Sequence, residues 1–111
     1  MSIDIKISKK IRSPKEIRKY LSNNKKLKSI MCHGNFDLVH PGHIRHLLYA
    51  KSKANILIAS CTADRSIKKN KSTPVIPEKL RAKNLASLEM VDFVLIDENE
   101  TPINNINIIK P

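Results

Sequence analysis

The chain has 111 residues, enough for one domain with a small hydrophobic core. Hydrophobic residues make up 41% of it, which excludes a wholly disordered protein, and no apolar run is long enough to span a bilayer. The net charge of +11 favours anionic partners such as nucleotides, phosphorylated metabolites or nucleic acid, unless it reflects compositional drift in a chain rich in Lys, Asn and Ile. No charged-then-apolar signal pattern begins the sequence, so we expect a cytoplasmic protein without a membrane partner.

Residues 1–27 are expected to form a basic N-terminal extension with a helix. Apolar residues alternate over residues 1–12, which predicts a short edge strand or an extended arm. Ser13-Pro14-Lys15-Glu16 then has the pattern of a helix start, with a capping serine, a proline in the first turn and a glutamate that reaches back. This helix is predicted to run to about Leu21 and to lie outside the core of the fold.

Residues 28–111 are expected to form the main domain, in which strands alternate with helices. The first predicted strand covers Leu27 to Cys32, and a helical pattern follows Gly42, with Ile44, Leu47 and Leu48 facing inward. The second predicted strand, Asn55 to Cys61, is almost wholly apolar, as expected for a strand covered on both faces of a parallel sheet.

The second half of the domain repeats this alternation. A polar segment with clustered lysines, residues 62–77, precedes a predicted helix with Leu80, Leu85 and Leu88 inward and Arg81 outward. Residues 91–96 form the third predicted strand. Thr101-Pro102 is expected to cap a last helix that carries Ile103 and Ile106.

The order β-α-β-α-β-α predicts an α/β fold: a Rossmann-like open parallel sheet with three main strands and helices on both faces. Ligands of such sheets bind beyond the carboxyl ends of the strands. The turn after the first strand and the lysine-rich segment after the second are therefore expected to project from the same edge of the sheet.

The stretch from His33 to His43, His-Gly-Asn-Phe-Asp-Leu-Val-His-Pro-Gly-His, joins the first strand to the first helix. Gly34 lets a ligand approach the backbone. Pro41 and Gly42 shape a helix start whose unpaired amides and partial positive charge favour phosphate. His40 and His43, three positions apart, can donate hydrogen bonds that strengthen as charge builds on a phosphate in a transition state.

Two other interpretations of these histidines stay open at this point. They are either a coincidental surface pair or part of a metal site, and only His33 and His46 lie nearby as further ligands. We predict no metal site formed by protein ligands. Cys32 and Cys61 have no metal-ligand spacing and are predicted to be reduced thiols in the core.

The motif Gly34-Asn35-Phe36-Asp37-x-x-His40-x-Gly42-His43 resembles the signature of the cytidylyltransferase-like nucleotidyltransferases, which carry a His-x-Gly-His motif. The likeness extends through Thr62-Ala63-Asp64, Arg81 and residues 89–94, and covers about residues 28–111. It is strongest to the branch that contains heptose 1-phosphate adenylyltransferase domains and glycerol-3-phosphate cytidylyltransferases.

The resemblance implies that the phosphate of a sugar or polyol phosphate attacks the α-phosphorus of a nucleoside triphosphate, ATP or CTP. Pyrophosphate leaves, and Mg²⁺ accompanies the triphosphate. By this resemblance His40, His43 and Lys71 match catalytic residues. The residues that it places in nucleotide binding are Gly34, Asn35, Phe36, Asp37, Gly42, Lys69 and Arg81.

The family pattern continues with a further strand, a glycine-aspartate loop and an Ile-Ser-x-[ST] segment, none of which this sequence contains. We therefore expect the chain to be either the N-terminal part of such a domain or a shortened homologue, with an open sheet edge that invites pairing with a second copy. The alternative function is a nucleotide- or phosphate-binding module without turnover. A nucleic-acid partner is disfavoured, because the chain has only two Tyr, two Phe and no Trp for base stacking.

Overall fold

A computed structural model describes residues 2–67, 76–99 and 101–111 of the chain. Its centre is a parallel sheet of β1 (Ser29–Gly34), β2 (Ile56–Thr62) and β3 (Phe93–Asp97), in the order β1-β2-β3. The register pairs His33 with Ser60 and Thr62 with Asp97, so the carboxyl ends of the three strands lie at one edge. The predicted open parallel sheet is confirmed.

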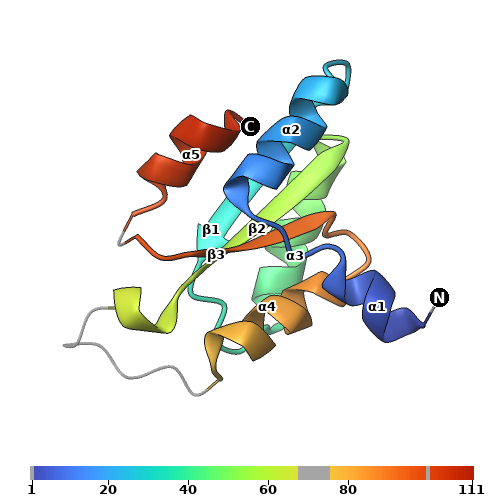
Figure 1. Cartoon of the computed structure of the whole chain (residues 1–111). Coiled ribbons are helices and arrows are strands. Elements are labelled where there is room, and N and C mark those ends of the chain that lie inside the picture. The colour runs from blue at the N-terminus through green and yellow to red at the C-terminus, as the bar shows by residue number, and fades with distance from the viewer. Residues whose placement is uncertain (1, 68–75, 100) are drawn as a thin grey trace.

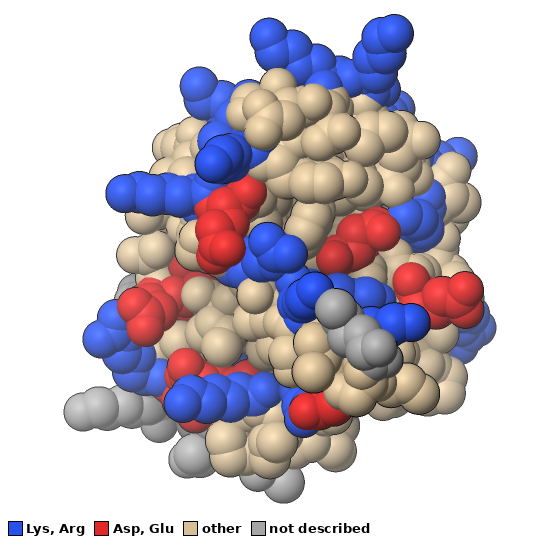
Figure 2. Space-filling model, turned by 45° about the vertical axis from the view of Figure 1, so that its right-hand side comes forward, with Lys and Arg blue, Asp and Glu red and all other residues tan. Residues whose placement is uncertain are grey.

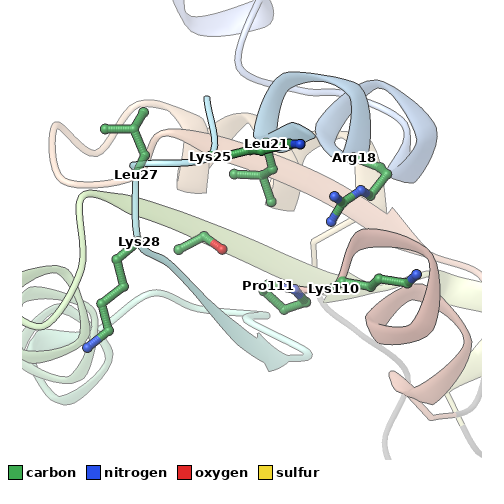
Figure 3. Close-up of a pocket in the computed structure, with 8 residues that line it drawn as sticks. Arg18, Leu21, Lys25, Leu27, Lys28, Lys110 and Pro111 are labelled. Carbon is green, nitrogen blue, oxygen red and sulfur yellow. The ribbon is translucent and has the colours of Figure 1, made fainter. Parts of the chain in front are cut away.

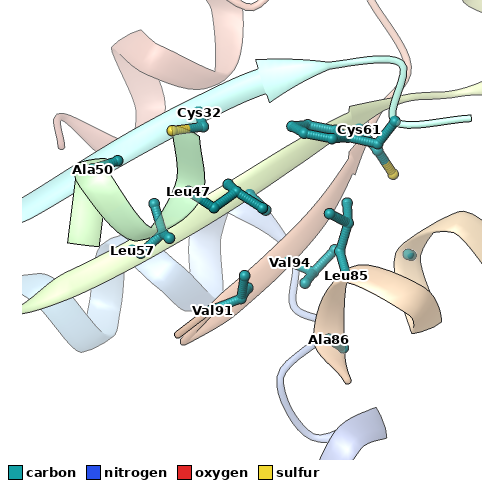
Figure 4. Packing of buried hydrophobic residues seen from close by; sticks show 12 residues of the cluster. Cys32, Leu47, Ala50, Leu57, Cys61, Leu85, Ala86, Val91 and Val94 are labelled. Atoms are coloured by element: carbon teal, nitrogen blue, oxygen red, sulfur yellow. The ribbon is translucent and has the colours of Figure 1, made fainter. Parts of the chain in front are cut away.

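Helices cover both faces of this sheet (Figure 1). On one face, α3 (Pro41–Ser52) and α4 (Glu78–Ala86) bury a core that includes Leu47, Leu57 and Leu85 (Figure 4). On the other face, α2 (Pro14–Asn23) and α5 (Ile103–Ile109) bury a second core around Ile17 and Ile58. All seven residues of β2 are buried, as predicted for a strand covered on both faces.

The N-terminal segment differs from its prediction. Residues Ile3–Ser8 form α1, a short helix whose N-terminus is capped by Ser2, rather than a strand. Ile3 and Ile5 are exposed, so their alternation reflects neither pairing nor burial. Only Ile11 continues the sheet: it forms an isolated parallel bridge with Val94 at the outer edge of β3.

The second helix has the predicted capping box, in which Ser13 and Glu16 each accept a hydrogen bond from the other's backbone N–H. The prediction that it lies outside the core is wrong. Ile17 is fully buried in the second core, and the Arg18 guanidinium donates to the carbonyl of Ile109 at 2.8 Å. Helix α2 therefore holds α5 against the sheet, a contact between segments about ninety residues apart that no local pattern reveals.

Several helices are rotated relative to the predicted faces. Leu48 and Leu80 were expected to face inward, and both are exposed, as are Ile103 and Ile106 of the last helix. Arg81, expected to face outward, is fully buried. The last helix begins at Ile103 after Pro102, and no side chain caps it, so Thr101 does not have the predicted capping role.

Cys32 and Cys61 are free and buried on the α3/α4 side, as predicted. Burial raises the pKa of both thiols, and that of Cys61 rises to about 11. Both cysteines therefore act as small apolar residues of the core.

Positive charge gathers at the amino end of the sheet, where α2 ends and the chain leads into β1 (Figure 2). A hollow of about 410 Å³ opens there, lined by residues that include Arg18, Lys25, Lys28 and Lys110. These cations do not converge, because the Lys28 side chain points away from the hollow (Figure 3). The hollow lies at the opposite end of β1 from the His33–His43 turn and contains no predicted site residue.

Candidate active site

The turn between β1 and α3 brings the motif residues to the carboxyl edge of the sheet. Gly34 ends β1 and Pro41 begins α3, so Asn35 to His40 form the connection. Phe36 has a left-handed backbone, with φ of 49°, which costs a residue other than glycine on the order of 1–3 kcal/mol. Its ring is buried between Gly34 and the His43 ring, and this burial offsets the strain.

His40 and His43 form a stacked pair at the start of α3, with ring centroids 3.9 Å apart. The backbone N–H of Gly42 donates to Nδ1 of His40 at 3.0 Å. The backbone N–H of His40 donates to Nδ1 of His43 at 3.3 Å. Because Nδ1 accepts a hydrogen bond in both rings, the neutral tautomer of both carries its proton on Nε2. These backbone contacts thus leave two adjacent Nε2–H donors that bind no other residue of the turn.

The predicted set of free amides at this helix start needs a correction. Pro41 has no N–H, and the N–H of Gly42 is occupied by His40. The donors that the helix start offers to an anion are therefore mainly the two imidazoles. A Cβ at Gly42 would lie 2.8 Å from Cε1 of His40, so the observed position of the His40 ring needs glycine here.

Arg81 ties the turn to the rest of the site. Its guanidinium donates to the carbonyl of Asn35 at 2.6 Å, to the carboxylate of Asp64 at 2.6 Å and to the carbonyl of Ile76 at 2.9 Å. These three acceptors explain why a charged residue on α4 turns inward. Arg81 joins the ends of β1 and β2 to the segment that precedes α4.

Asp37 makes a second connection between the turn and α4. Its carboxylate accepts a hydrogen bond from the backbone N–H of Ile76 at 2.9 Å. This contact holds the loop, and the predicted part of Asp37 in nucleotide binding stays a prediction. Lys69 and Lys71, the predicted lysines of the site, lie outside the described residues.

A polar cluster behind the turn, buried apart from the half-buried His33, was not recognised from the sequence. It lies on the α5 side of the sheet, at the carboxyl ends of all three strands, and consists of His33, Ser60, Thr62 and Asp97. Asp97 is fully buried, and its Oδ2 atom has no hydrogen-bond partner within the described part of the chain. Only the strand register, which pairs His33 with Ser60 and Thr62 with Asp97, reveals that these residues lie together.

The described residues contain no group of three or more His, Cys, Asp or Glu side chains that could hold a metal ion. No helix among them is long and apolar enough to cross a membrane.

The sheet topology, the turn and the histidine pair define a Rossmann-like nucleotidyltransferase fold. The family model described as cytidylyltransferase-like matches residues 31–110. The chain belongs to the cytidylyltransferase-like family.

Similar proteins agree with this assignment. The chain is 40% identical over 109 residues to the bifunctional protein HldE of Campylobacter jejuni, covering 96% of this chain and 23% of that protein. It is 45% identical over 86 residues to HldE of Aliarcobacter butzleri, covering 76% of this chain and 18% of that protein. The chain thus spans about a quarter or less of the length of these relatives.

A solved structure resembles the fold. The lipopolysaccharide core biosynthesis protein from Thermoplasma volcanium superposes with a TM-score of 0.71 and 25% sequence identity, covering 77% of this chain and 70% of that one. This likeness supports the Rossmann-like topology.

Proposed function

We propose that the chain carries the catalytic turn of a nucleotidyltransferase that transfers a nucleoside monophosphate from ATP or CTP to a sugar or polyol phosphate. The observation that carries the proposal is the stacked pair of His40 and His43, both with Nδ1 bound to backbone N–H groups. Both rings then direct Nε2–H donors away from their own backbone. Membership of the cytidylyltransferase-like family supports the reaction class, and the resemblance of the motif to sugar-phosphate nucleotidyltransferases is the ground for the proposed acceptor.

The proposed reaction is a direct displacement. An oxygen of the acceptor's phosphate forms a bond to the α-phosphorus, while the bond from that phosphorus to the bridging oxygen of the β-phosphate breaks and pyrophosphate leaves. Negative charge builds on the non-bridging oxygens of the α-phosphate, and the two Nε2–H groups stabilise it. Mg²⁺ would bind the triphosphate oxygens and neutralise charge on the leaving pyrophosphate.

The remaining site residues hold this geometry. Arg81 and Asp37 fix the turn from the α4 side, and burial of the Phe36 ring fixes its backbone. Lys69 and Lys71 are proposed to add positive charge toward the triphosphate. We place the reaction in the cytoplasm, where nucleoside triphosphates are made.

A panel assay tests the proposal. The chain is incubated with Mg²⁺, each nucleoside triphosphate and a set of sugar and polyol phosphates, while pyrophosphate release and triphosphate binding are measured in parallel. Release that requires both partners supports the transferase. Saturable triphosphate binding without release in any combination would instead support the binding module, and tight RNA binding that survives loss of both histidines would contradict a nucleotidyltransferase.

A further inference from the structure

We infer that His33 is a positioning residue that holds the phosphate-binding turn through a directed chain of hydrogen bonds: Ser60 to His33, His33 to Thr62, and Thr62 to the carbonyl of Gly34. The inference deepens the proposed function and rests on it. His33 is the residue before Gly34, and its ring faces β2 on the α5 side of the sheet, away from His40 and His43.

Three contacts define the chain. Nδ1 of His33 lies 2.8 Å from Oγ of Ser60, and Nε2 lies 3.4 Å from Oγ1 of Thr62. The Thr62 hydroxyl lies 3.5 Å from the carbonyl oxygen of Gly34. Ser60 is fully buried and Thr62 nearly so, which means that water does not readily replace these partners. The last two contacts are long, so the link between Thr62 and the turn is the part most easily lost.

One arrangement of protons satisfies all three contacts at once. Each hydroxyl has a single proton to donate. If the Ser60 hydroxyl donates to Nδ1, the proton of His33 is on Nε2 and is donated to Thr62. The Thr62 proton is then available for Gly34. In the opposite tautomer Thr62 must donate to Nε2, and the carbonyl of Gly34 loses this donor.

The hydrogen-bond chain acts on the backbone of the turn. In the parallel register that pairs Gly34 with Cys61, the Gly34 carbonyl meets the backbone N–H of Thr62, and the Thr62 hydroxyl is its second donor. In a trans peptide the C=O and the following N–H point in opposite directions, so holding the Gly34 carbonyl also holds the direction of the Asn35 N–H. The Asn35 carbonyl is already held by Arg81 at 2.6 Å. His33 therefore supports one side of Asn35 from the α5 face, while Arg81 supports the other side from α4.

The surroundings of His33 favour the neutral imidazole that the hydrogen-bond chain requires. Burial lowers the pKa of His33 below its ordinary value, and the nearby carboxylate of Asp97 on β3 opposes that shift without reversing it. At neutral pH the tautomer is thus set by hydrogen bonding rather than by a second proton.

The first test of the inference needs no activity. Long-range ¹H–¹⁵N NMR of the whole chain at pH 8 reports which nitrogen of His33 carries the proton, and His33→Gln identifies its signals. We expect the proton on Nε2 in the wild type and a mixture of tautomers in Thr62→Val. A wild-type His33 protonated on Nδ1 would overturn the inference whether or not the chain is an enzyme.

The second test separates positioning from stability. Thr62→Val keeps the shape and removes the hydroxyl, whereas Thr62→Ser keeps the hydroxyl and is the matched control. We expect Thr62→Val and His33→Phe to lower kcat by about tenfold to a hundredfold, while Thr62→Ser and His33→Gln, which retain donors, recover most of it. The effects of Thr62→Val and His33→Phe on kcat should be non-additive, because both substitutions break the same hydrogen-bond chain.

The outcomes distinguish this inference from the proposed function. If the wild type is an active enzyme and Thr62→Val keeps full activity, the hydrogen-bond chain has no positioning role, and the proposed transferase function still stands. If the wild type releases no pyrophosphate, the transferase fails, and triphosphate affinity replaces kcat as the readout for the same variants. Equal affinity in Thr62→Val and Thr62→Ser would then overturn the inference.

Discussion

Replacing Gly42 with alanine should separate catalysis from folding. The new Cβ would lie 2.8 Å from Cε1 and 3.1 Å from Nδ1 of His40, both inside normal contact distance. His40 is exposed, so its ring can turn away, but it then loses the 3.0 Å bond from the Gly42 N–H and its stacking on His43.

The two effects on stability oppose each other. Loss of a helix-capping hydrogen bond costs about 1 kcal/mol, and alanine is favoured over glycine within a helix by a similar ~1 kcal/mol. We therefore expect a nearly unchanged free energy of unfolding. Displacing one of two positioned donors should lower the rate by roughly 10²–10³, as for other donors to a developing anion.

Pyrophosphate release and urea unfolding, measured on the same preparations, provide the assay. Leu48→Ala, which truncates an exposed side chain on α3, is the control and should change neither quantity. If Gly42→Ala keeps activity within twofold of the wild type while His40→Ala is inactive, Gly42 does not position the His40 ring. The proposed reason for glycine at this place would then be wrong.

Four further outcomes are expected. Arg81→Met should lower the free energy of unfolding by about 1–3 kcal/mol, since it leaves the Asn35 and Ile76 carbonyls and the Asp64 carboxylate without their donor. Asp64→Asn, which takes the counter-charge from the fully buried guanidinium, should also lower it in the same urea titration. Cys61, with its pKa raised to about 11, should react with a thiol reagent at pH 8 only as fast as the chain unfolds, and prompt modification in the native state would contradict its burial. The pKa of His33 is lowered in the folded state, so the unfolded chain binds the extra proton more readily. The contribution of neutral His33 to stability is therefore full above the unfolded pKa near 6.5 and is lost as the pH falls through the folded pKa. His33→Gln should flatten that part of a curve of unfolding free energy against pH. Ile11 occupies the β3 edge of the sheet, and no described segment pairs with the edge of β1, so a second copy can pair there. Light scattering should then show concentration-dependent dimers. A strict monomer at all concentrations would count against that pairing.

Local sequence patterns predicted what local physics controls. The Ser13–Glu16 capping box needs only residues within one helical turn, and the apolar run in β2 needs only burial on both faces. The His40–His43 pair was also predictable, because its geometry comes from the first turn of α3.

Features that depend on distant partners were not predictable. Arg81 faces inward because acceptors from three separate segments converge on it, whereas helical periodicity assigned it to solvent. Ile17 is buried because α5 returns over the same face. The role of His33 depends on hydroxyl groups of β2, which only the strand register brings beside it.

Transfer of the α-phosphoryl group is the central claim and can be followed directly. The chain is incubated with Mg²⁺, an acceptor phosphate from the active combinations of the panel, and a nucleoside triphosphate labelled with ³²P at the α-phosphate. The account predicts that the label moves to the acceptor product and not to pyrophosphate, and that His40→Ala and His43→Ala each slow this transfer by at least about a hundredfold. Label in pyrophosphate or free phosphate, or transfer that both variants retain, would contradict it.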